Sequence, residues 1–242
     1  MNYKLQIQDV HHIFNQGQPN EVYALKGVNL NFNAGELVLI VGHNGSGKST
    51  LLNIIDGRIR QTKGHVIIDN YIVDDLKVYQ RAKYIYRIFQ DTLNGLIRIA
   101  SIKENMAFAK KRNSKFRITQ PLIKKTDLDY FKNILIAFNK TLANDLDKKI
   151  FNLSPGERQA VILALLEMQK DLQPQILLAD EPTASLDPEM SLKSFNTIKS
   201  LSEKGWLCLV VTHDEALIRS EQYDRMIKFE KGTVVADVKL KD

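Results

Sequence analysis

Residues Gly42 to Thr50 read GHNGSGKST and match the phosphate-binding loop pattern G-x-x-x-x-G-K-[ST] at every position. They follow Leu37 to Val41, a continuous apolar run of the length typical of a buried strand. Apolar residues at the spacing of one helix face come next, and Gly57 suits the end of that helix. A strand, a glycine-rich turn and a helix in this order predict a P-loop nucleotide site.

The residue types of this loop fit phosphate chemistry. Gly42, Gly45 and Gly47 allow backbone angles that turn successive N–H groups toward one anion. A helix that begins near Lys48 adds its positive N-terminal end. Lys48 can reach the β and γ phosphates, and the hydroxyl of Ser49 can ligate Mg²⁺. The competing interpretation, a glycine-rich turn with a chance lysine, leaves the flanking strand and helix unexplained.

Length and composition are those of an ordinary globular protein. The chain has 242 residues, of which 44% are hydrophobic and 26% charged. No apolar run approaches the roughly 18 residues needed to span a bilayer, and the start, MNYKLQIQDV, lacks the features of a signal peptide. The single cysteine, Cys208, lies in the apolar run LCLVV and is expected in the core. These features predict a cytoplasmic location.

The formal charge of +6 is concentrated in one segment. Residues 91–150 contain 13 Lys or Arg against 6 Asp or Glu, and KKRNSKFR from Lys110 to Arg117 is their densest part. No glycine or aromatic interleaving typical of RNA-binding motifs accompanies it. A solvated basic surface is therefore the default interpretation, and a face near anionic lipid is the alternative.

The alternation of apolar residues predicts two structural regions. We expect an antiparallel β layer within residues 3–40, formed by Tyr3 to Val10, Ala24 to Phe32 and Leu37 to Val41. The hairpin 64–73 would return to this layer, and residues 84–89 would form a further strand. Residues 91–152 show helical apolar spacing, at Leu128, Phe131, Ile134, Leu135 and Phe138, and predict a helical insert packed on the core.

Polar residues follow two further apolar strands. Asp180 and Glu181 end the run ILLA, and His213 follows the run LCLVV. Carboxyl ends of parallel strands are where an α/β sheet presents its ligands, so these side chains are expected near the P-loop. Asp180 can hold Mg²⁺ through water, and Glu181 can orient or deprotonate an attacking water.

The segment LSPGERQ predicts a capped helix start. Ser154 is a good N-cap, Pro155 suits the first helical position and Glu157 completes a capping box. This can be a purely structural feature, but a helix N-terminus with a free hydroxyl can also receive an anion. Phe14, in the first connection of the β layer, is a candidate for stacking on a nucleotide base, with Tyr23 as its competitor.

These motifs together resemble those of the ATP-binding subunits of ABC transporters, over essentially the whole chain. The match lies in their order: Walker A (GHNGSGKST), the Q-loop residue Gln90, the signature motif (LSPGE), the Walker B strand with its glutamate (ILLADE), the D-loop ASLD ending at Asp187, and the switch histidine His213. Phe14 stands where this family places an adenine-stacking aromatic residue.

The resemblance implies an α/β fold, namely a P-loop NTPase with a RecA-like core, an antiparallel β layer and an inserted α-helical subdomain. We expect one ABC ATPase domain over residues 1–242. Residues 1–90 and 165–242 would form the nucleotide-binding core, and residues 91–164 the helical subdomain with the signature motif.

The resemblance also implies the composition of an ATP site shared by two copies of the chain. The residues expected to bind ATP are Phe14, Gly42, His43, Asn44, Gly45, Ser46, Gly47, Lys48, Ser49, Thr50, Gln90, Ser154, Gly156, Glu157 and Asp187. In this arrangement Ser154 and the N–H of Gly156 meet the γ-phosphate held by the partner chain. Mg²⁺ would rest on Ser49, Gln90 and, through water, Asp180. Glu181 would polarise the attacking water, and His213 and Lys48 would stabilise the transferring phosphoryl group.

The expected partners follow from the same resemblance. The chain would pair head to tail as a homodimer on ATP binding and drive separate transmembrane permease subunits from the cytoplasmic face of the membrane, as a peripheral protein. The insert after Gln90 would contact those subunits, and a substrate-binding protein would join if the system is an importer. Nucleic acid is not an expected partner.

We expect an importer of amino acids or similar small solutes, with an exporter as the alternative. RAKYIYRIFQDTLNG, from Arg81 to Gly95, resembles the ATPases of tryptophan/tyrosine-type importers, whereas EVYALKGVNL also suits lipoprotein-releasing and macrolide-type exporters. Two other classes compete with a transport ATPase: a soluble ABC-type ATPase acting on nucleic acid, and a nucleotide-gated module that hydrolyses poorly.

The signature motif departs from the usual LSGGQ. Pro155 replaces a glycine and removes a backbone donor, and Glu157 replaces the glutamine and brings negative charge near a phosphate. We therefore expect weaker ATP-driven pairing than with LSGGQ. A capping box would turn the Glu157 carboxylate toward its own helix and limit the repulsion.

Overall fold

A computed structural model describes residues 3–112, 121–170, 175–184 and 186–240. Contacts between residues divide the chain into two compact units. The first consists of Met1–Arg87, Pro174–Glu181 and Lys199–Asp242, and the second consists of Ile88–Gln173 and Pro182–Ile198. The expected boundary between residues 164 and 165 falls inside a helix, Pro155–Glu167, that stays within the second unit. Among the described residues, every helix is too short or too polar to be a membrane span.

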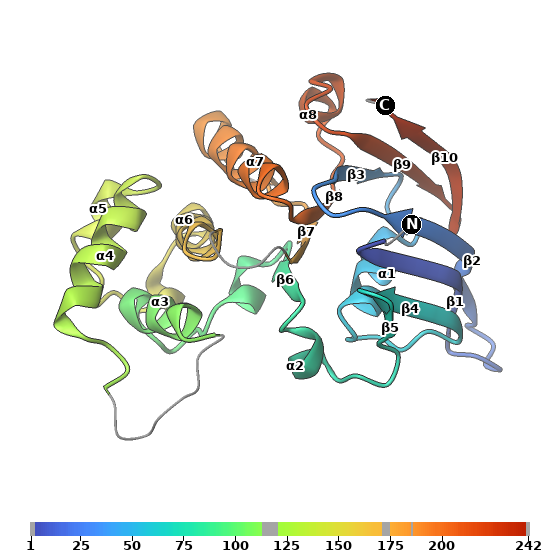
Figure 1. Ribbon diagram of the computed structural model, residues 1–242, viewed down its shortest axis with the longest axis horizontal. Coiled ribbons are helices and arrows are strands. Elements are labelled where there is room, and N and C mark those ends of the chain that lie inside the picture. The colour runs from blue at the N-terminus through green and yellow to red at the C-terminus, as the bar shows by residue number, and fades with distance from the viewer. Residues whose placement is uncertain (1–2, 113–120, 171–174, 185, 241–242) are drawn as a thin grey trace. The chain divides into compact units, whose positions relative to one another are not determined.

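An antiparallel sheet of four strands, in the order β2-β1-β4-β5, forms one layer of the first unit (Figure 1). Its strands are β1 (Leu5–Phe14), β2 (Val22–Phe32), β4 (Lys63–Ile68) and β5 (Tyr71–Ile72). The predicted return of a hairpin to this layer is confirmed, because β4 pairs with both β1 and β5. Phe14 is the last residue of β1 and is paired with Val22, so its expected place in a connection is wrong.

A six-stranded sheet, in the order β10-β9-β3-β8-β7-β6, forms the second layer. Its strands are β3 (Leu37–Val41), β6 (Ile85–Ile88), β7 (Ile176–Asp180), β8 (Leu207–Val211), β9 (Arg225–Glu230) and β10 (Thr233–Lys239). The expectation that Leu37 to Val41 belongs to the antiparallel layer is wrong, because β3 pairs in parallel with β8 and β9. Its continuous apolar run reflects burial of every residue, as is typical of a central parallel strand.

Helix α1 (Lys48–Ile55) joins the two layers into one core. Its residues Leu51, Leu52, Ile54 and Ile55 are fully buried in a cluster with apolar side chains of both sheets. The helix ends at Ile55, and Gly57 follows with φ 82°, a left-handed conformation that suits glycine and confirms the predicted stop. The short helices α2 (Val78–Arg81) and α8 (Glu215–Arg219) complete this unit.

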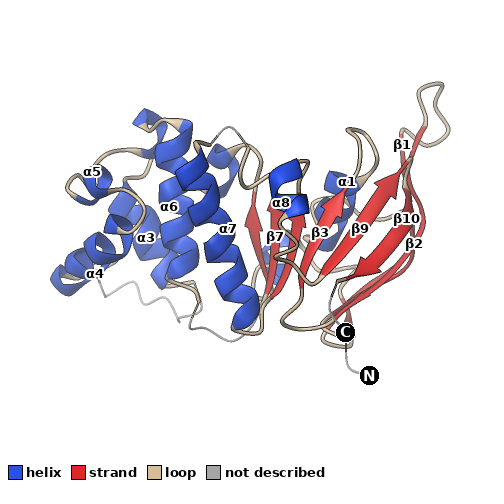
Figure 2. Ribbon diagram, turned by 90° about the horizontal axis from the view of Figure 1, so that it is seen from above, coloured by secondary structure: helices blue, strands red, loops and turns tan. Residues whose placement is uncertain are grey.

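The second unit is helical within its described residues (Figure 2). It contains η1 (Thr92–Gly95), α3 (Ile102–Lys110), α4 (Lys125–Ile136), α5 (Lys140–Ala143), η2 (Ile150–Asn152), α6 (Pro155–Glu167) and the start of α7 (Pro188–Glu203). The predicted helix around Phe131 and Leu135 is confirmed as α4, and both side chains are fully buried. This apolar face packs α4 against α5 and α6.

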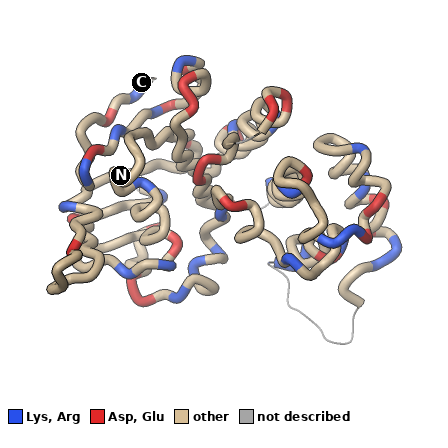
Figure 3. The backbone as a smooth tube through the Cα atoms, turned by 180° about the vertical axis from the view of Figure 1, so that it is seen from behind, with Lys and Arg blue, Asp and Glu red and all other residues tan. Residues whose placement is uncertain are grey.

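Lysines of the basic segment are interspersed with acidic residues (Figure 3). Four of them form ion pairs within the second unit: Lys103 with Asp147, Lys110 with Asp127, Lys148 with Glu157, and Lys149 with Glu104. Most of the densest stretch, KKRNSKFR, lies outside the described residues. The described part of the segment therefore carries charges of both signs, and the choice between a solvated basic surface and a face near anionic lipid stays a prediction.

Candidate functional site

The loop between β3 and α1 is shaped by glycines that tolerate close backbone contacts. A Cβ on Gly42 would lie 2.3 Å from the carbonyl oxygen of Phe229, and one on Gly47 would lie 2.6 Å from that of Ala24. Gly47 is the N-cap of α1 with φ 105°, and no side chain caps the helix start. The first amides of α1 thus stay available for an anion, as the P-loop pattern predicts.

Lys48 lies folded over its own loop. Its ammonium donates to the carbonyl oxygens of Gly42 and His43 at 2.7 and 2.9 Å. Burial lowers the pKa of Lys48, and the carboxylates of Glu181 and Asp180 partly offset that shift. The cation is therefore placed among the groups expected to handle phosphate, and its hydrogen bonds to the loop can be exchanged for phosphate oxygens.

Ser49 and Asp180 meet at the edge of the parallel sheet. The Ser49 hydroxyl donates to Oδ1 of Asp180 over 3.3 Å, although the two residues are 131 positions apart in the sequence. A hydroxyl and a carboxylate oxygen are hard ligands of the kind that Mg²⁺ prefers in nucleotide sites, where the phosphates and water supply the rest. The donor set thus fits Mg²⁺.

Glu181 and His213 form a pair beside this site. Nδ1 of His213 lies 2.7 Å from Oε1 of Glu181, with the imidazole largely exposed and the carboxylate nearly buried. Glu181 adopts φ 51°, a left-handed conformation that costs about 1 kcal/mol for a residue with a Cβ. Its N–H donates to the carbonyl of Val211 over 2.9 Å, which holds the backbone in place.

The strand order explains why these residues meet. β3, β8 and β7 are adjacent and parallel, so the P-loop, His213 and the Asp180–Glu181 pair all follow carboxyl ends at one edge of the sheet. In the first unit the structure thus brings together Lys48, Ser49, Asp180, Glu181 and His213. His43, Asn44, Gly45, Ser46 and Thr50 belong to the same loop and helix start.

Phe14 presents a partly open ring at the end of β1. Its exposed fraction is 37%, and the ring packs edge-on against the imidazole of His12 at 4.4 Å between centroids. Burial lowers the pKa of His12, which favours a neutral imidazole in contact with the Phe14 ring. Tyr23 is also exposed, at 54%, so both aromatic candidates for base stacking are accessible.

The signature helix α6 in the second unit has the predicted capping box. The N–H of Glu157 donates to the Ser154 hydroxyl over 3.2 Å, and the N–H of Ser154 donates to Oε2 of Glu157 over 2.7 Å. Lys148, which sequence reasoning did not single out, donates to Oε1 of Glu157 over 2.9 Å. Although burial raises it, the pKa of Glu157 is lowered overall by the Ser154 and Lys148 contacts.

Other predicted residues of the second unit are accessible. Gln90 and Ser154 are exposed, and a Cβ built on Gly156 meets no atom within 4 Å. Asp187 is also exposed, and its carboxylate accepts from the N–H of Met190 over 2.9 Å at the start of α7. These positions therefore leave polar groups and backbone open to a ligand or a second chain.

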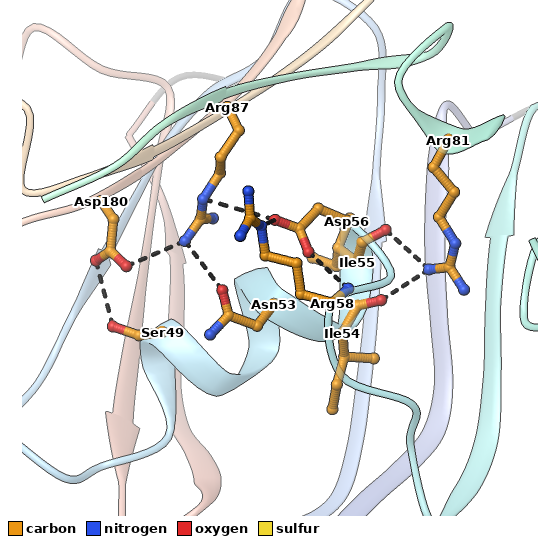
Figure 4. A network of polar contacts seen from close by, with 9 residues as sticks. All are labelled: Ser49, Asn53, Ile54, Ile55, Asp56, Arg58, Arg81, Arg87 and Asp180. Carbon is orange, nitrogen blue, oxygen red and sulfur yellow. Dashed lines mark hydrogen bonds and ion pairs between the residues drawn. The ribbon is translucent and has the colours of Figure 1, made fainter. Parts of the chain in front are cut away.

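Three residues make hydrogen bonds near the predicted site residues, although no sequence motif predicts these contacts. Gln159, buried on α6, donates to the carbonyl of Pro182 over 3.0 Å, directly after the catalytic candidate Glu181. Arg158 donates to Thr92 over 3.0 Å and so links α6 to the segment that follows Gln90. Arg87 binds Asp180 over 3.1 Å in the first unit (Figure 4). The one available signal was a cation inside the apolar strand 84–89.

Comparison with known proteins assigns the chain to a family. A family model described as ABC transporter matches residues 25–184. The chain belongs to the ABC transporter family. This confirms the resemblance carried by the motif order, and the chain is an ATP-binding ATPase of that family.

Individual relatives cover nearly the whole ABC ATPase chain. It is 36% identical over 228 residues to the tyrosine transport ATP-binding protein of Clostridioides difficile, covering 93% of this chain and 87% of that one. The lipoprotein-releasing system ATP-binding protein LolD of Acinetobacter baylyi is 33% identical, with 89% of this chain and 91% of that one covered.

A solved structure confirms the expected fold class. The ATP-binding cassette MJ0796, in a dimeric post-hydrolysis state with ADP and Pi, superposes with a TM-score of 0.80 at 30% identity, covering 98% of this chain and 99% of that one. The fold is that of an ABC ATPase with a P-loop core.

Proposed function

We propose that this ABC ATPase powers a membrane transporter as one half of a head-to-tail pair of ATPase chains that drives separate permease subunits. The observation that carries the proposal is the convergence of the Glu181–His213 pair with Lys48 and the Ser49–Asp180 contact at one sheet edge. At this edge a phosphate-binding lysine, two candidate metal ligands and a candidate general base lie together. Hydrolysis of a nucleotide phosphate requires these groups.

In the proposed reaction, Glu181 polarises the water that attacks the γ-phosphate in line. His213 keeps the carboxylate oriented through its Nδ1 contact, and its largely exposed ring is proposed to hydrogen-bond to the transferring phosphoryl group. Lys48 exchanges its bonds to the loop carbonyls for β- and γ-phosphate oxygens. The loop amides from Gly42 to Thr50 hold the remaining phosphate charge.

Ser49 and Asp180 are the residues that would hold Mg²⁺, Asp180 through water, and Gln90 is proposed as a further ligand. Bound there, Mg²⁺ would neutralise charge on the β- and γ-phosphates. Phe14 is proposed to stack on the adenine base, since its ring is partly exposed and is held by an edge-on contact with His12.

The second wall of each ATP site is proposed to come from the partner chain. The residues proposed for it are Ser154, Gly156, Glu157 and Asp187. Ser154 and Asp187 are exposed, and a Cβ on Gly156 would meet no atom of its own chain within 4 Å. The relative MJ0796 is dimeric in its ADP-bound structure, which supports this arrangement. Release of the pair after hydrolysis would then return the transporter to its resting state.

An apolar surface in the helical unit supports contact with membrane subunits. Ile99 and Phe151 are 81% and 61% exposed, and the N–H of Phe151 donates to the carbonyl of Arg98 over 3.1 Å, so the two side chains belong to neighbouring segments. Large exposed apolar side chains often mark interaction sites. We propose that this surface meets the permease at the cytoplasmic face of the membrane.

We favour import of amino acids or similar small solutes, because the relative with 36% identity is a tyrosine transport ATP-binding protein. An importer would also use a substrate-binding protein. The 33% identity to LolD keeps a lipoprotein-releasing or macrolide-type exporter as the second candidate. Co-purification with identified permease chains would decide between them.

Turnover of purified protein tests the catalytic assignment. We expect Glu181→Gln to lower the ATPase rate by at least about a hundredfold, because the amide cannot act as a base. Glu215→Gln is the matched control, since Glu215 is exposed on α8 and pairs only with Arg219 in the described contacts. Equal rates for wild type and Glu181→Gln would disprove the assignment, and stimulation by DNA or RNA would favour a nucleic-acid ATPase.

A further inference from the structure

Arg87 is a buried cation between two buried carboxylates. It lies on β6, and its side chain is 8% exposed, against 6% for Asp56 and 10% for Asp180. Asp56 caps the carboxyl end of α1, and Asp180 ends β7. Buried charges are stable only when they are paired, so this arrangement is unlike an ordinary surface ion pair.

The two carboxylate oxygens of Asp180 have different partners. Nη2 of Arg87 donates to Oδ2 of Asp180 over 3.1 Å and to Oδ1 of Asn53 over 3.4 Å. The other carboxylate oxygen, Oδ1, accepts from Ser49 over 3.3 Å (Figure 4). One oxygen of Asp180 is thus held by Arg87, while the other faces the hydroxyl that is expected to ligate Mg²⁺.

Asp56 has a cation partner of its own besides Arg87. Nε of Arg58 lies 3.4 Å from Oδ2 of Asp56, and the N–H of Arg58 donates to Oδ1 over 3.0 Å. Nε of Arg87 lies farther from Asp56, at 3.8 Å. Two guanidinium groups therefore face two carboxylates, and the closer ion pair of Arg87 is the one with Asp180.

We propose that Arg87 is a positioning residue for the metal site, which holds Oδ2 of Asp180 so that Oδ1 faces Mg²⁺ beside Ser49. The proposal rests on the proposed role of Asp180 as a ligand of Mg²⁺ through water. Hydrogen-bond partners of metal-ligating groups are worth about tenfold to a hundredfold in metal affinity. Arg87 thereby sets how much Mg²⁺ strengthens nucleotide binding. The loop amides bind phosphate whether or not Mg²⁺ is present.

An arginine suits this position better than a lysine. Its planar fork reaches Asp180 and Asn53 with one nitrogen while another lies toward Asp56. The point charge of a lysine can pair with Asp180 but cannot keep the fixed orientation. Arg87→Lys should therefore retain part of the effect, and Arg87→Met should lose it.

Arg81 provides a matched control. It is also buried, at 1% exposure, and also binds α1, since Nη1 donates to the carbonyls of Ile54 and Ile55 over 2.7 and 2.9 Å. Figure 4 shows Arg81 at the end of the helix away from Asp180. Loss of Arg81 would weaken the end of α1 without removing the guanidinium from Asp180.

The experiment measures binding of the fluorescent, non-hydrolysable nucleotide mant-AMP-PNP, once in EDTA and once in Mg²⁺. The ratio of the two dissociation constants is the metal-dependent gain. We expect Arg87→Met to reduce the gain about tenfold with the EDTA value unchanged, and Arg87→Lys to reduce it less. Arg81→Met should lower Tm and keep the wild-type gain, and Asp180→Asn should lose most of it.

Each other result has a defined meaning. A wild-type gain in Arg87→Met and Arg87→Lys, with the gain lost in Asp180→Asn, overturns the role of Arg87 but leaves the metal role of Asp180 intact. A full gain in Asp180→Asn overturns the metal role itself. Equal weakening in EDTA and Mg²⁺ shows general damage to the P-loop and also overturns the proposal. Should Arg87→Met not fold, Arg87→Lys decides.

Discussion

Nζ of Lys148 lies 2.9 Å from Oε1 of Glu157, at the start of the signature helix. The other carboxylate oxygen of Glu157 accepts from the N–H of Ser154, so both oxygens are engaged within the chain. The negative charge that replaces the usual glutamine is therefore paired and turned toward its own helix. This contact reduces the repulsion that a γ-phosphate of the partner chain would otherwise meet.

Lys148→Met should weaken ATP-driven pairing of the chains. The loss of the ammonium leaves Glu157 unpaired on its Oε1 side, at a cost of up to about 1 kcal/mol or fivefold in dimer affinity. Sedimentation velocity with ATP, in the Glu181→Gln background that we expect to hydrolyse slowly, measures the effect.

Glu157→Gln supplies the control for this change. In the Glu157→Gln background there is no charge to cover, so adding Lys148→Met should have little further effect. If Lys148→Met weakens pairing equally in both backgrounds, Lys148 acts by another route and the pairing with Glu157 is irrelevant to the dimer.

Restoring the usual signature residues should strengthen pairing. The double variant Pro155→Gly and Glu157→Gln returns a backbone donor and removes a carboxylate at the start of α6. Because of these two changes we expect tighter ATP-driven dimers. We also expect a lower Tm, because the capping box and Pro155 at the first helical position stabilise the start of the helix. Unchanged dimerisation and turnover would contradict the interpretation that the altered signature weakens the site.

Local patterns in the sequence were enough to predict much of this structure. The P-loop, the helix stop at Gly57 and the capping box of Ser154 and Glu157 each depend on residues within a few positions of one another. The family was also predictable, because the order of the motifs restricts the alternatives. The individual roles of the site residues stay predictions.

Contacts between distant residues were not predictable in the same way. The run Leu37 to Val41 indicates burial, but it does not indicate whether its neighbours run parallel, so the sequence alone does not predict the sheet to which it belongs. Arg87 and Asp180 are 93 positions apart, and their pairing depends on β6 lying beside β7. A buried arginine within an apolar strand signals that a partner exists without saying which.

Cys208 should be unreactive in the folded protein. Burial raises the pKa of its thiol well above the ordinary value of 9.0, so little thiolate forms at pH 8 in the native state. We expect iodoacetamide to label the native protein at least about a hundredfold more slowly than the protein in urea. Mass spectrometry would follow the modification, with Cys208→Ala as the unlabelled control, and rapid native labelling would show that β8 opens readily.

Gly156→Ala should separate folding from pairing. A Cβ at position 156 meets no atom of its own chain within 4 Å, and Gly156 does not adopt a positive φ, so alanine is compatible with the local fold. Alanine is also the better helix former, and we expect Tm to stay within about 2 °C of wild type or to rise. The added methyl group would stand beside the N–H proposed to meet the partner's γ-phosphate, which should weaken ATP-driven dimers about tenfold or more.

Gly47→Ala is the contrasting variant, because its Cβ would lie 2.6 Å from the Ala24 carbonyl and should destabilise the fold itself. Full dimerisation of Gly156→Ala, in the Glu181→Gln background, would show that the start of α6 does not face the nucleotide of a second chain.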